Sequence, residues 1–359
     1  MTNSPYSAAR DPDSGNDPIR YEAENLDLHP SADSSWLGDT VPDIDVGALA
    51  GPADGHAASD AVAQIAQACR DWGFFQVVNH GVPADLMQNL WRQTEAFFAL
   101  PSASKESLRR TRANPWGYYD NELTKNQRDK KEVFDYTAAG VDPIYGAENR
   151  WPPQAAGFRD TMLAYLDATT ALSLQLMRAF CVGLDLPADY MEREFAGKHT
   201  GFMRLNCYPV RDPLANATIE HQPRAGMGVH HHTDAGVLTV LLQDEVGGLQ
   251  VHRDGMWHDI PPVAGAFVIN TGDMMQVWSN DTYQAAIHRV LAMQDRDRYS
   301  VPFFFNPPAG TRVEPLPTVV NEDRPARYRG IDWADYRGKR TDGDYADYGT
   351  EVQISQFLL

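Results

Sequence analysis

A histidine and an aspartate two residues apart, with a further histidine much later in the chain, most strongly constrain the fold. His232 and Asp234 flank Thr233, and His288 follows. Side chains at positions i and i+2 of a β-strand point to the same face of a sheet. His232 and Asp234 can therefore bind one metal ion from a single strand, while a later strand folds back to supply His288. The chain must then place two strands that are distant in sequence side by side.

Two histidines and one carboxylate are the facial ligand set of non-haem Fe(II) oxygenases, because they leave the opposite coordination positions open. A second interpretation exists, since His230 and His232 could form a cupin-like H-x-H metal pair. That pattern also requires a glutamate a few residues on, and residues 235–241 contain none. We therefore prefer His232, Asp234 and His288 as ligands. Zinc could occupy the same ligands but would be inert in redox chemistry.

Two other predicted strands carry side chains that bind carboxylates. Arg298 and Ser300 are again an i, i+2 pair. Arginine binds a carboxylate through two parallel hydrogen bonds, and a serine hydroxyl adds another. Residues 204–209 read as a strand that ends at a proline, with Arg204, Asn206 and Tyr208 all on one side. Tyr208 offers a second donor to a carboxylate.

The order of these and other motifs resembles that of the plant- and microbe-type 2-oxoglutarate and Fe(II)-dependent oxygenases, the isopenicillin N synthase-like superfamily. The resemblance covers roughly residues 41 to 310. Its further motifs are VPDID at 41–45, WGFFQVVNHGVP at 72–83, KEVF at 131–134, GLQV at 248–251, NTGD at 270–273, HRV at 288–290 and FFFNP at 303–307.

The resemblance implies a mixed α/β (α+β) fold with a double-stranded β-helix, or jelly roll, as its core and N-terminal helices and βα units as support. It implies Fe(II) as the cofactor, with 2-oxoglutarate and O2 as cosubstrates. In that family Arg298 and Ser300 would hold the distal carboxylate of 2-oxoglutarate. Tyr208, together with Asn206, would hold the carboxylate next to the metal.

Three residues are expected to line the pocket for the primary substrate. The resemblance places an aromatic side chain of the strand after Arg298 against the substrate, and Phe305 is the candidate. Phe134 of the KEVF motif and His230, beside the ligand His232, are the others. For Phe305, packing in the hydrophobic core explains an aromatic-rich strand equally well. For the KEVF motif, the ordinary interpretation of the preceding residues 128–132 is a run of charged side chains exposed to solvent.

The implied activity is oxidation of a small organic molecule by hydroxylation, desaturation or cyclisation, in secondary metabolism. Two alternatives stay open. In an iron oxidase of the isopenicillin N synthase type, which does not use 2-oxoglutarate, Arg298 and Ser300 would bind another anion. The N-x-Y-P context of Tyr208 favours 2-oxoglutarate. The second alternative is a non-catalytic metal-binding protein on the same jelly roll.

Composition narrows the range of partners. The formal charge of −18, with no lysine- or arginine-rich run, argues against nucleic acid, because phosphate binding needs a basic face. No window approaches the roughly 18 apolar residues of a membrane span. The three cysteines are scattered and odd in number, which favours a reducing compartment. We expect a cytoplasmic protein that does not contact membranes, and the oligomeric state cannot be read from the sequence.

The pattern along the chain predicts four regions. Residues 1–38 are rich in Asp, Ser, Asn, Pro and Gly and read as a flexible N-terminal arm. Residues 39–199 should be mostly helical and pack on the barrel, with helices at 60–72, 84–99 and 157–184 and a strand at 74–78. Residues 200–310 should form the jelly roll, with strands at 236–243, 248–252, 266–270, 276–278 and 299–305. Residues 311–359 remain as a C-terminal extension that packs on this core.

Overall fold

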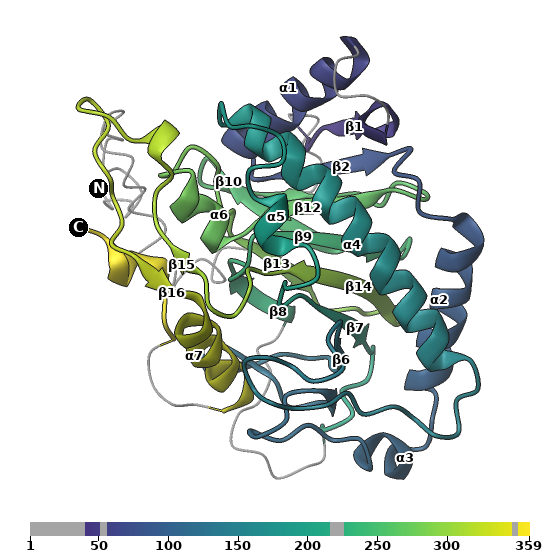
Figure 1. The fold of residues 1–359 in the computed structure, drawn as a ribbon. Coiled ribbons are helices and arrows are strands. Elements are labelled where there is room, and N and C mark those ends of the chain that lie inside the picture. The colour runs from purple at the N-terminus through teal and green to yellow at the C-terminus, as the bar shows by residue number, and fades with distance from the viewer. Residues whose placement is uncertain (1–39, 51–55, 216–225, 347–350) are drawn as a thin grey trace, which may run out of the picture.

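The computed structural model describes residues 40–50, 56–215, 226–346 and 351–359. Two facing β-sheets form its centre, and long helices cover one of them (Figure 1). The predicted N-terminal arm, residues 1–38, lies outside the described residues.

The larger sheet has eight strands in the order β1-β2-β12-β9-β14-β7-β6-β3. Only the β1 and β2 pair is parallel; the other neighbours are antiparallel. In sheet order the strands are β1 (Asp43–Asp45), β2 (Phe74–Val78), β12 (Phe267–Thr271), β9 (Leu238–Gln243), β14 (Arg298–Phe305), β7 (Phe202–Tyr208), β6 (Glu132–Thr137) and β3 (Gly117–Tyr119). Strands from the N-terminal half thus extend the sheet at both edges, whereas the sequence predicted that this half mainly supplies helices.

The smaller sheet has the antiparallel order β11-β10-β13-β8. Its strands are β11 (Met256–Asp259), β10 (Leu249–Arg253), β13 (His288–Leu291) and β8 (Met227–His232). Apolar side chains of both sheets meet in one buried cluster, which includes Phe74 and Leu241 of the larger sheet and Val229, Val251 and Val290 of the smaller one. This arrangement is the expected jelly-roll core of a mixed α/β fold.

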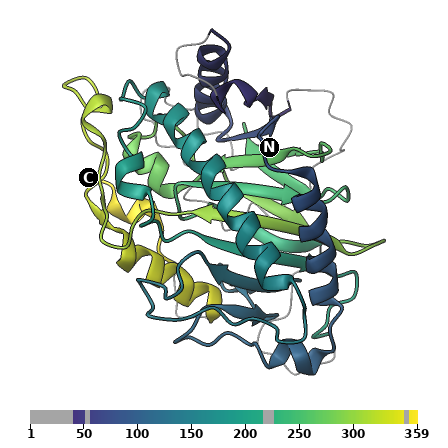
Figure 2. The same ribbon diagram turned by 45° about the vertical axis from the view of Figure 1, so that its right-hand side comes forward.

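Helices cover the outer face of the larger sheet. Figure 2 shows α4 (Phe158–Gly183) crossing the strands, with α2 (Ala84–Phe98) beside it. A stripe of α4, including Tyr165, Leu172 and Leu176, belongs to the same hydrophobic core as Val240 of β9. With α1 (His56–Asp71), these are the three predicted helices, because apolar residues recur at helical spacing in each. The short helices α3 (Ser102–Glu106) and α5 (Glu192–Phe195) connect the longer elements.

One predicted strand is wrong. Residues 276–278 lie in the helix α6 (Asp273–Trp278), all of whose residues are buried. A short apolar run does not distinguish a buried strand from a buried helix, so tertiary contacts decide. Here the backbone N–H of Met274 donates to the carbonyl of Gly236, which starts the helix against the loop after β8.

The C-terminal residues pack against one end of the jelly roll. The helix α7 (Trp333–Tyr345) buries Trp333, whose Nε1 donates to Thr200 Oγ1 at 2.8 Å. Arg340 of the same helix donates to the carbonyl of Thr233 at 2.9 Å. The remaining elements are short: η3 (Gly47–Ala50), β4 (Leu123–Thr124), β5 (Gln127–Arg128), β15 (Arg312–Val313), η4 (Pro317–Val319), β16 (Ile331–Asp332) and η5 (Ile354–Phe357). In the described part of the chain, no helix combines the length and the apolar character that crossing a membrane requires.

Candidate active site

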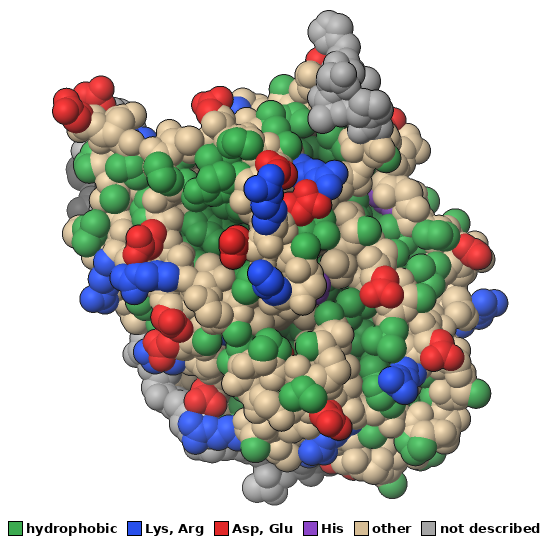
Figure 3. Space-filling model, in the orientation of Figure 1, with side chains coloured by type: hydrophobic (Ala, Val, Ile, Leu, Met, Phe, Trp, Pro, Cys, Tyr) green, Lys and Arg blue, Asp and Glu red, His purple; other side chains and the backbone are tan. Residues whose placement is uncertain are grey.

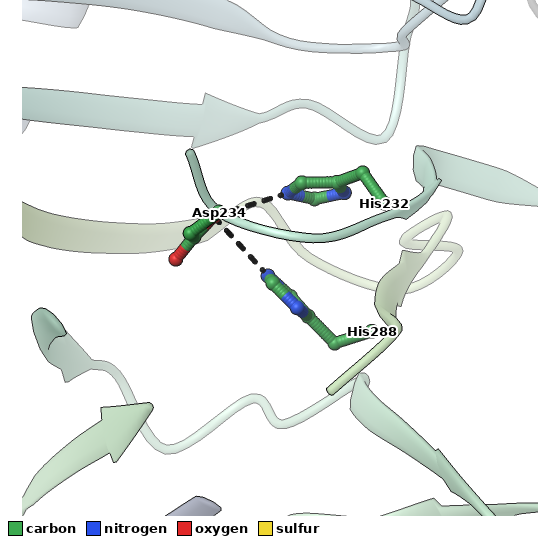
Figure 4. A group of neighbouring side chains, drawn as sticks. All are labelled: His232, Asp234 and His288. Carbon is green, nitrogen blue, oxygen red and sulfur yellow. Dashed lines mark ion pairs between the residues drawn. The ribbon is translucent and has the colours of Figure 1, made fainter. Parts of the chain in front are cut away.

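The three predicted metal ligands come together at one end of the smaller sheet (Figure 4). His232 ends β8 and pairs in register with His288, which begins β13. Asp234 lies just beyond β8, in the loop that follows the strand, rather than within the strand as the sequence predicted. Its Oδ1 lies 3.6 Å from His232 Nε2 and 3.7 Å from His288 Nε2. One potential ligand atom from each residue therefore lies within 4.8 Å of the others.

Backbone carbonyls orient both imidazole rings. His232 Nδ1 lies 2.8 Å from the carbonyl oxygen of His230, and His288 Nδ1 lies 3.1 Å from that of Ala286. Because a carbonyl only accepts hydrogen bonds, each Nδ1 carries a proton, and each Nε2 faces Asp234. Such outer hydrogen bonds are typical of metal-binding histidines, since they set the tautomer and the ring orientation.

Asp234 is held so that one of its oxygens faces the histidines. Its Oδ2 accepts hydrogen bonds from Thr239 Oγ1 and from Asn270 Nδ2, on the neighbouring strands β9 and β12. Burial alone would raise the pKa of Asp234, but His288 beside it, together with His232 and Asn270, holds this pKa well below its usual range. Burial, with a smaller effect of His232, lowers the pKa of His288 to about 4. At neutral pH the site thus offers a charged carboxylate and a neutral His288, the protonation states that bind metals.

The loop that carries Asp234 is fixed by the start of α6. The N–H of Asp273 donates to the carbonyl of Asp234 at 2.7 Å, and the N–H of Gly272 donates to that of Val237 at 2.9 Å. A Cβ atom at position 272 would lie 2.4 Å from the carbonyl oxygen of Gly236, so the close approach requires glycine there. The NTGD motif therefore holds the metal-binding loop through its backbone and through Asn270. The donor set and its fixed geometry fit a facial Fe(II) site.

A cavity beside the triad has two lobes. The first includes His232, Asp234 and His288 in its wall, and the second includes His232 and Asp234. The two lobes share Lys131, Arg204, Val229, His232, Asp234 and Phe304. Two of the candidate metal ligands, His232 and Asp234, thus stand where the lobes meet.

The first lobe contains a buried arginine whose hydrogen-bonding capacity is largely unused. Arg298 is 0% exposed, and its Nη2 donates to Gln243 Oε1 at 3.3 Å. Its Nε and Nη1 have no hydrogen-bond partner. The guanidinium lies over the Tyr208 ring, 4.9 Å from its centroid. A buried cation with free donors is costly unless an anion pairs with it, so the surroundings of Arg298 favour an anion such as a carboxylate in this lobe.

The other predicted 2-oxoglutarate residues line the same lobe. Ser300 pairs in register with Asn206, and Asn206 Nδ2 donates to Ser300 Oγ at 3.2 Å. Asn206 Oδ1 has no partner. Arg298, Ser300, Asn206 and Tyr208 all contribute to the lobe wall, so the alternation inferred for β7 and β14 brings these four side chains to one cavity.

The structure does not place Phe305 in the cavity. Its side chain is 0% exposed and packs against Phe195, at a ring-centroid distance of 5.2 Å, in the main hydrophobic core. Alternation explains the difference, because even-numbered positions of β14 follow Arg298 and Ser300 toward the cavity. Phe304 is therefore the aromatic residue that lines both lobes. Counting in steps of two from Ser300 would have identified it.

Phe134 and His230 also lie elsewhere than expected. Phe134 is fully buried in the hydrophobic core, where its ring lies 4.6 Å from that of Phe97. His230 is 1% exposed, and its Nδ1 pairs with Asp129 Oδ1 at 3.0 Å. Neither residue lines the lobes that contain the metal ligands. His230 instead fixes Asp129, and its backbone N–H donates to the same oxygen.

Sequence reasoning missed a group of buried charged residues in the cavity wall. Lys131, in a run that reads as solvated, is 4% exposed and contacts Glu122 at 2.7 Å. Arg204 makes two hydrogen bonds to Glu122 and two to Asp135. Strand alternation placed Arg204 on the face of Asn206 and Tyr208, but no local pattern signals that Lys131 and Arg204 are buried and paired, because each charge depends on partners that are distant in sequence.

Comparisons with known proteins agree with this site. Residues 200–307 match the model of the 2OG-Fe(II) oxygenase superfamily, and residues 41–154 match that of the N-terminal region of a non-haem dioxygenase in morphine synthesis. Protein DMR6-LIKE OXYGENASE 2 of Arabidopsis thaliana is 35% identical over 95% of this chain and 93% of its own length. Jasmonate-induced oxygenase 2 of the same plant is 33% identical over 82% of this chain and 78% of its own length.

Solved structures show the same fold. The crystal structure of JOX2 in complex with 2OG, Fe and JA has a TM-score of 0.75 and 28% identity, covering 95% of this chain and 97% of that one. The crystal structure of the dioxygenase for auxin oxidation in rice has a TM-score of 0.68 and 28% identity, covering 89% of this chain and 100% of that one. The chain belongs to the 2OG-Fe(II) oxygenase superfamily and is a 2-oxoglutarate-dependent dioxygenase.

Proposed function

We propose that His232, Asp234 and His288 bind Fe(II) and that Arg298 and Ser300 bind the distal carboxylate of 2-oxoglutarate. The observation that carries this assignment is the buried guanidinium of Arg298, which has free donors in the same cavity as the triad. Tyr208 and Asn206, on the strand paired with Arg298 and Ser300, would contact the carboxylate nearer the metal. The substrate is a small organic molecule, as it is for the relatives.

When bound, the iron would supply the oxidising chemistry, with O2 as the oxidant: one oxygen atom of O2 would go to 2-oxoglutarate, which becomes succinate and CO2, and the other would oxidise a C–H bond of the substrate. The protein supplies position and surroundings. Arg298 and Ser300 fix one end of the cosubstrate, and the hydrogen bonds from Thr239 and Asn270 keep one oxygen of Asp234 directed at the metal. Phe304, which lines both lobes, helps to exclude water from the reacting centre.

An anaerobic titration tests the assignment. The apoprotein is titrated with Fe(II) and then 2-oxoglutarate while the visible metal-to-ligand charge-transfer band is recorded. We expect the band in the wild type, its loss in Asp234→Ala, and a much higher 2-oxoglutarate requirement in Arg298→Ala. Arg193→Gln, a change of a side chain that is 82% exposed, serves as the control. Iron binding without a band would favour the oxidase that does not use 2-oxoglutarate.

We also propose a cytoplasmic enzyme that does not bind nucleic acids or membranes. Support comes from the three cysteines, which are all free and buried, as a reducing compartment allows. On the face shown in Figure 3, lysine and arginine side chains are interspersed with acidic ones rather than gathered in a basic patch. Retention of a labelled protein by anionic vesicles or by DNA at physiological salt would contradict this part of the proposal.

A further inference from the structure

The second lobe of the cavity, which leads away from the 2-oxoglutarate residues, has a wall rich in cations. Its aromatic part consists of Phe202 and Phe304, whose rings stack with centroids 4.7 Å apart. Beside them stand four basic side chains: Lys131, Arg204, Arg337 and Arg340. Whether these charges are already neutralised by the protein decides what the lobe can bind.

Two of the four cations are held by buried carboxylates. Lys131 Nζ lies 2.7 Å from Glu122 and 3.1 Å from Asp129. Arg204 directs its Nε, Nη1 and Nη2 to Glu122 and Asp135, at 2.7–2.8 Å. Neither side chain is therefore an unpaired cation.

A third cation, Arg340, is also paired. Its Nε lies 2.9 Å from Glu351, and its Nη1 and Nη2 donate to the carbonyls of Val352 and Thr233. Apart from Glu122 and the proposed metal ligand Asp234, the carboxylate of the lobe wall is Asp344, which interacts electrostatically with Arg204 and Arg340. Glu122 and Asp344 thus interact with these three cations.

Arg337 differs from the other three. Its Nη1 donates to Thr341 Oγ1 at 2.5 Å, and its guanidinium lies over the Phe202 ring, 4.6 Å from the centroid. Among the described residues, no carboxylate forms an ion pair with it, although the residue is only 9% exposed. Tyr145 OH donates to the same Thr341 hydroxyl at 2.7 Å. Arg337 is thus held in place by groups that do not neutralise it.

We propose that the primary substrate carries a carboxylate, which Arg337 binds, on an apolar body that packs against Phe202 and Phe304. This inference rests on the proposed function, because the lobe is a substrate site only if His232 and Asp234 in its wall hold iron. A guanidinium pairs with a carboxylate through two parallel hydrogen bonds. Arg337, which has no ion pair among the described residues, matches a single negative charge, whereas a phosphate monoester would bring a second charge to a lobe that also contains Glu122 and Asp344.

The test measures binding rather than turnover, so it does not require the physiological substrate. The full chain is loaded anaerobically with Fe(II) and saturating 2-oxoglutarate. Benzoate, phenylacetate, cyclohexaneacetate and naphthylacetate, each with its methyl ester, are then titrated while the charge-transfer band is followed. We expect the best acid to perturb the band at a concentration about tenfold or more below that needed for its ester, as loss of a charged hydrogen-bond partner predicts. A panel in which no acid binds more tightly than its ester overturns the proposal.

Variants identify the arginine responsible. Arg337→Gln should remove the preference for acids over esters, whereas Arg337→Lys should retain part of it, and Arg193→Gln should retain it fully. A preference that survives unchanged in Arg337→Gln overturns the assignment. The comparison of acid with ester in the wild type needs no variant, so the test remains decisive if Arg337→Gln fails to fold.

Two outcomes separate this proposal from the assignment of the iron and 2-oxoglutarate sites. If no band forms before any probe is added, the proposed function fails. If the band forms but an acid bleaches it, the acid has displaced 2-oxoglutarate at Arg298, and this result counts against binding at Arg337. Tighter binding of phenyl phosphate than of every carboxylate would overturn the carboxylate assignment.

Discussion

Replacement of Arg298 by methionine should make the apoprotein more stable while it weakens 2-oxoglutarate binding. In the structure, Arg298 is 0% exposed and makes a single hydrogen bond, of 3.3 Å, to Gln243. Two of its three guanidinium nitrogens have no partner, and no ion pair to it occurs among the described residues. Methionine has a similar length and carries no charge, so it can fill the same buried space without an unmet requirement for an anion.

The magnitudes follow from these unpaired atoms. A buried polar atom without a partner costs about 1–3 kcal/mol, so we expect the free energy of unfolding of the apoprotein to rise by roughly 1–3 kcal/mol in Arg298→Met. In the complex, the variant loses hydrogen bonds to a charged group worth about 1.5–3 kcal/mol each. Loss of two such bonds weakens 2-oxoglutarate binding by about 150-fold or more.

The assay combines denaturation with ligand binding. Urea unfolding of the metal-free protein gives the change in stability, and the anaerobic charge-transfer titration gives the affinity for 2-oxoglutarate. Arg128→Met is the matched control, because Arg128 is also 0% exposed but forms a two-pronged ion pair with Asp212 at 2.6 and 2.7 Å. That control should lose about 3 kcal/mol or more, since it leaves a partly buried carboxylate unpaired. A less stable Arg298→Met apoprotein, or an unchanged 2-oxoglutarate affinity, would refute the reasoning.

Three further predictions test the site and its surroundings. His230→Ala should retain Fe(II) and the charge-transfer band that His232→Ala abolishes; loss of iron in both would instead support the H-x-H ligand pair. Phe305→Ala should lower the free energy of unfolding in urea by about 3–5 kcal/mol, as truncations of core side chains do. Phe304→Ala should mainly alter the KM for the substrate. The reverse pattern would mean that β14 directs Phe305, and not Phe304, to the cavity. Burial, with Glu122 and Glu351 nearby, raises the pKa of Asp344 from 3.8 to about 6. The contribution of this carboxyl to the stability of the fold is therefore complete only below pH 3.8. It is lost as the pH rises through about 6, because the buried carboxyl then ionises. Asp344→Asn should therefore increase stability by roughly 1–3 kcal/mol at pH 7.5 and by less at pH 4.5, and equal effects at both pH values would argue against the shift.

Local sequence patterns were sufficient to group the side chains of the proposed site. Alternation of side chains along a strand depends only on backbone geometry, so it correctly grouped Arg298 with Ser300 and Asn206 with Tyr208. The spacing of His232, Asp234 and His288 likewise identified a group that the structure brings within 4.8 Å. The resemblance, by contrast, suggested Phe305 as a residue of the substrate pocket, one position out of step with this alternation, and Phe304 lines the cavity instead.

Tertiary structure decided everything that depends on partners distant in sequence. Residues 276–278 form a helix rather than a strand because the loop after β8 binds the start of α6. Lys131 is buried because Glu122 and Asp129 neutralise it, whereas Arg337, equally charged in the sequence, meets no carboxylate among the described residues. The sequence by itself grouped the candidate ligands His232, Asp234 and His288 through their spacing, and its motif order indicated the family and hence the jelly-roll class, since spacing and motifs are local features. Which charges are neutralised, and hence what the second lobe can bind, depended on long-range pairing that no local pattern records.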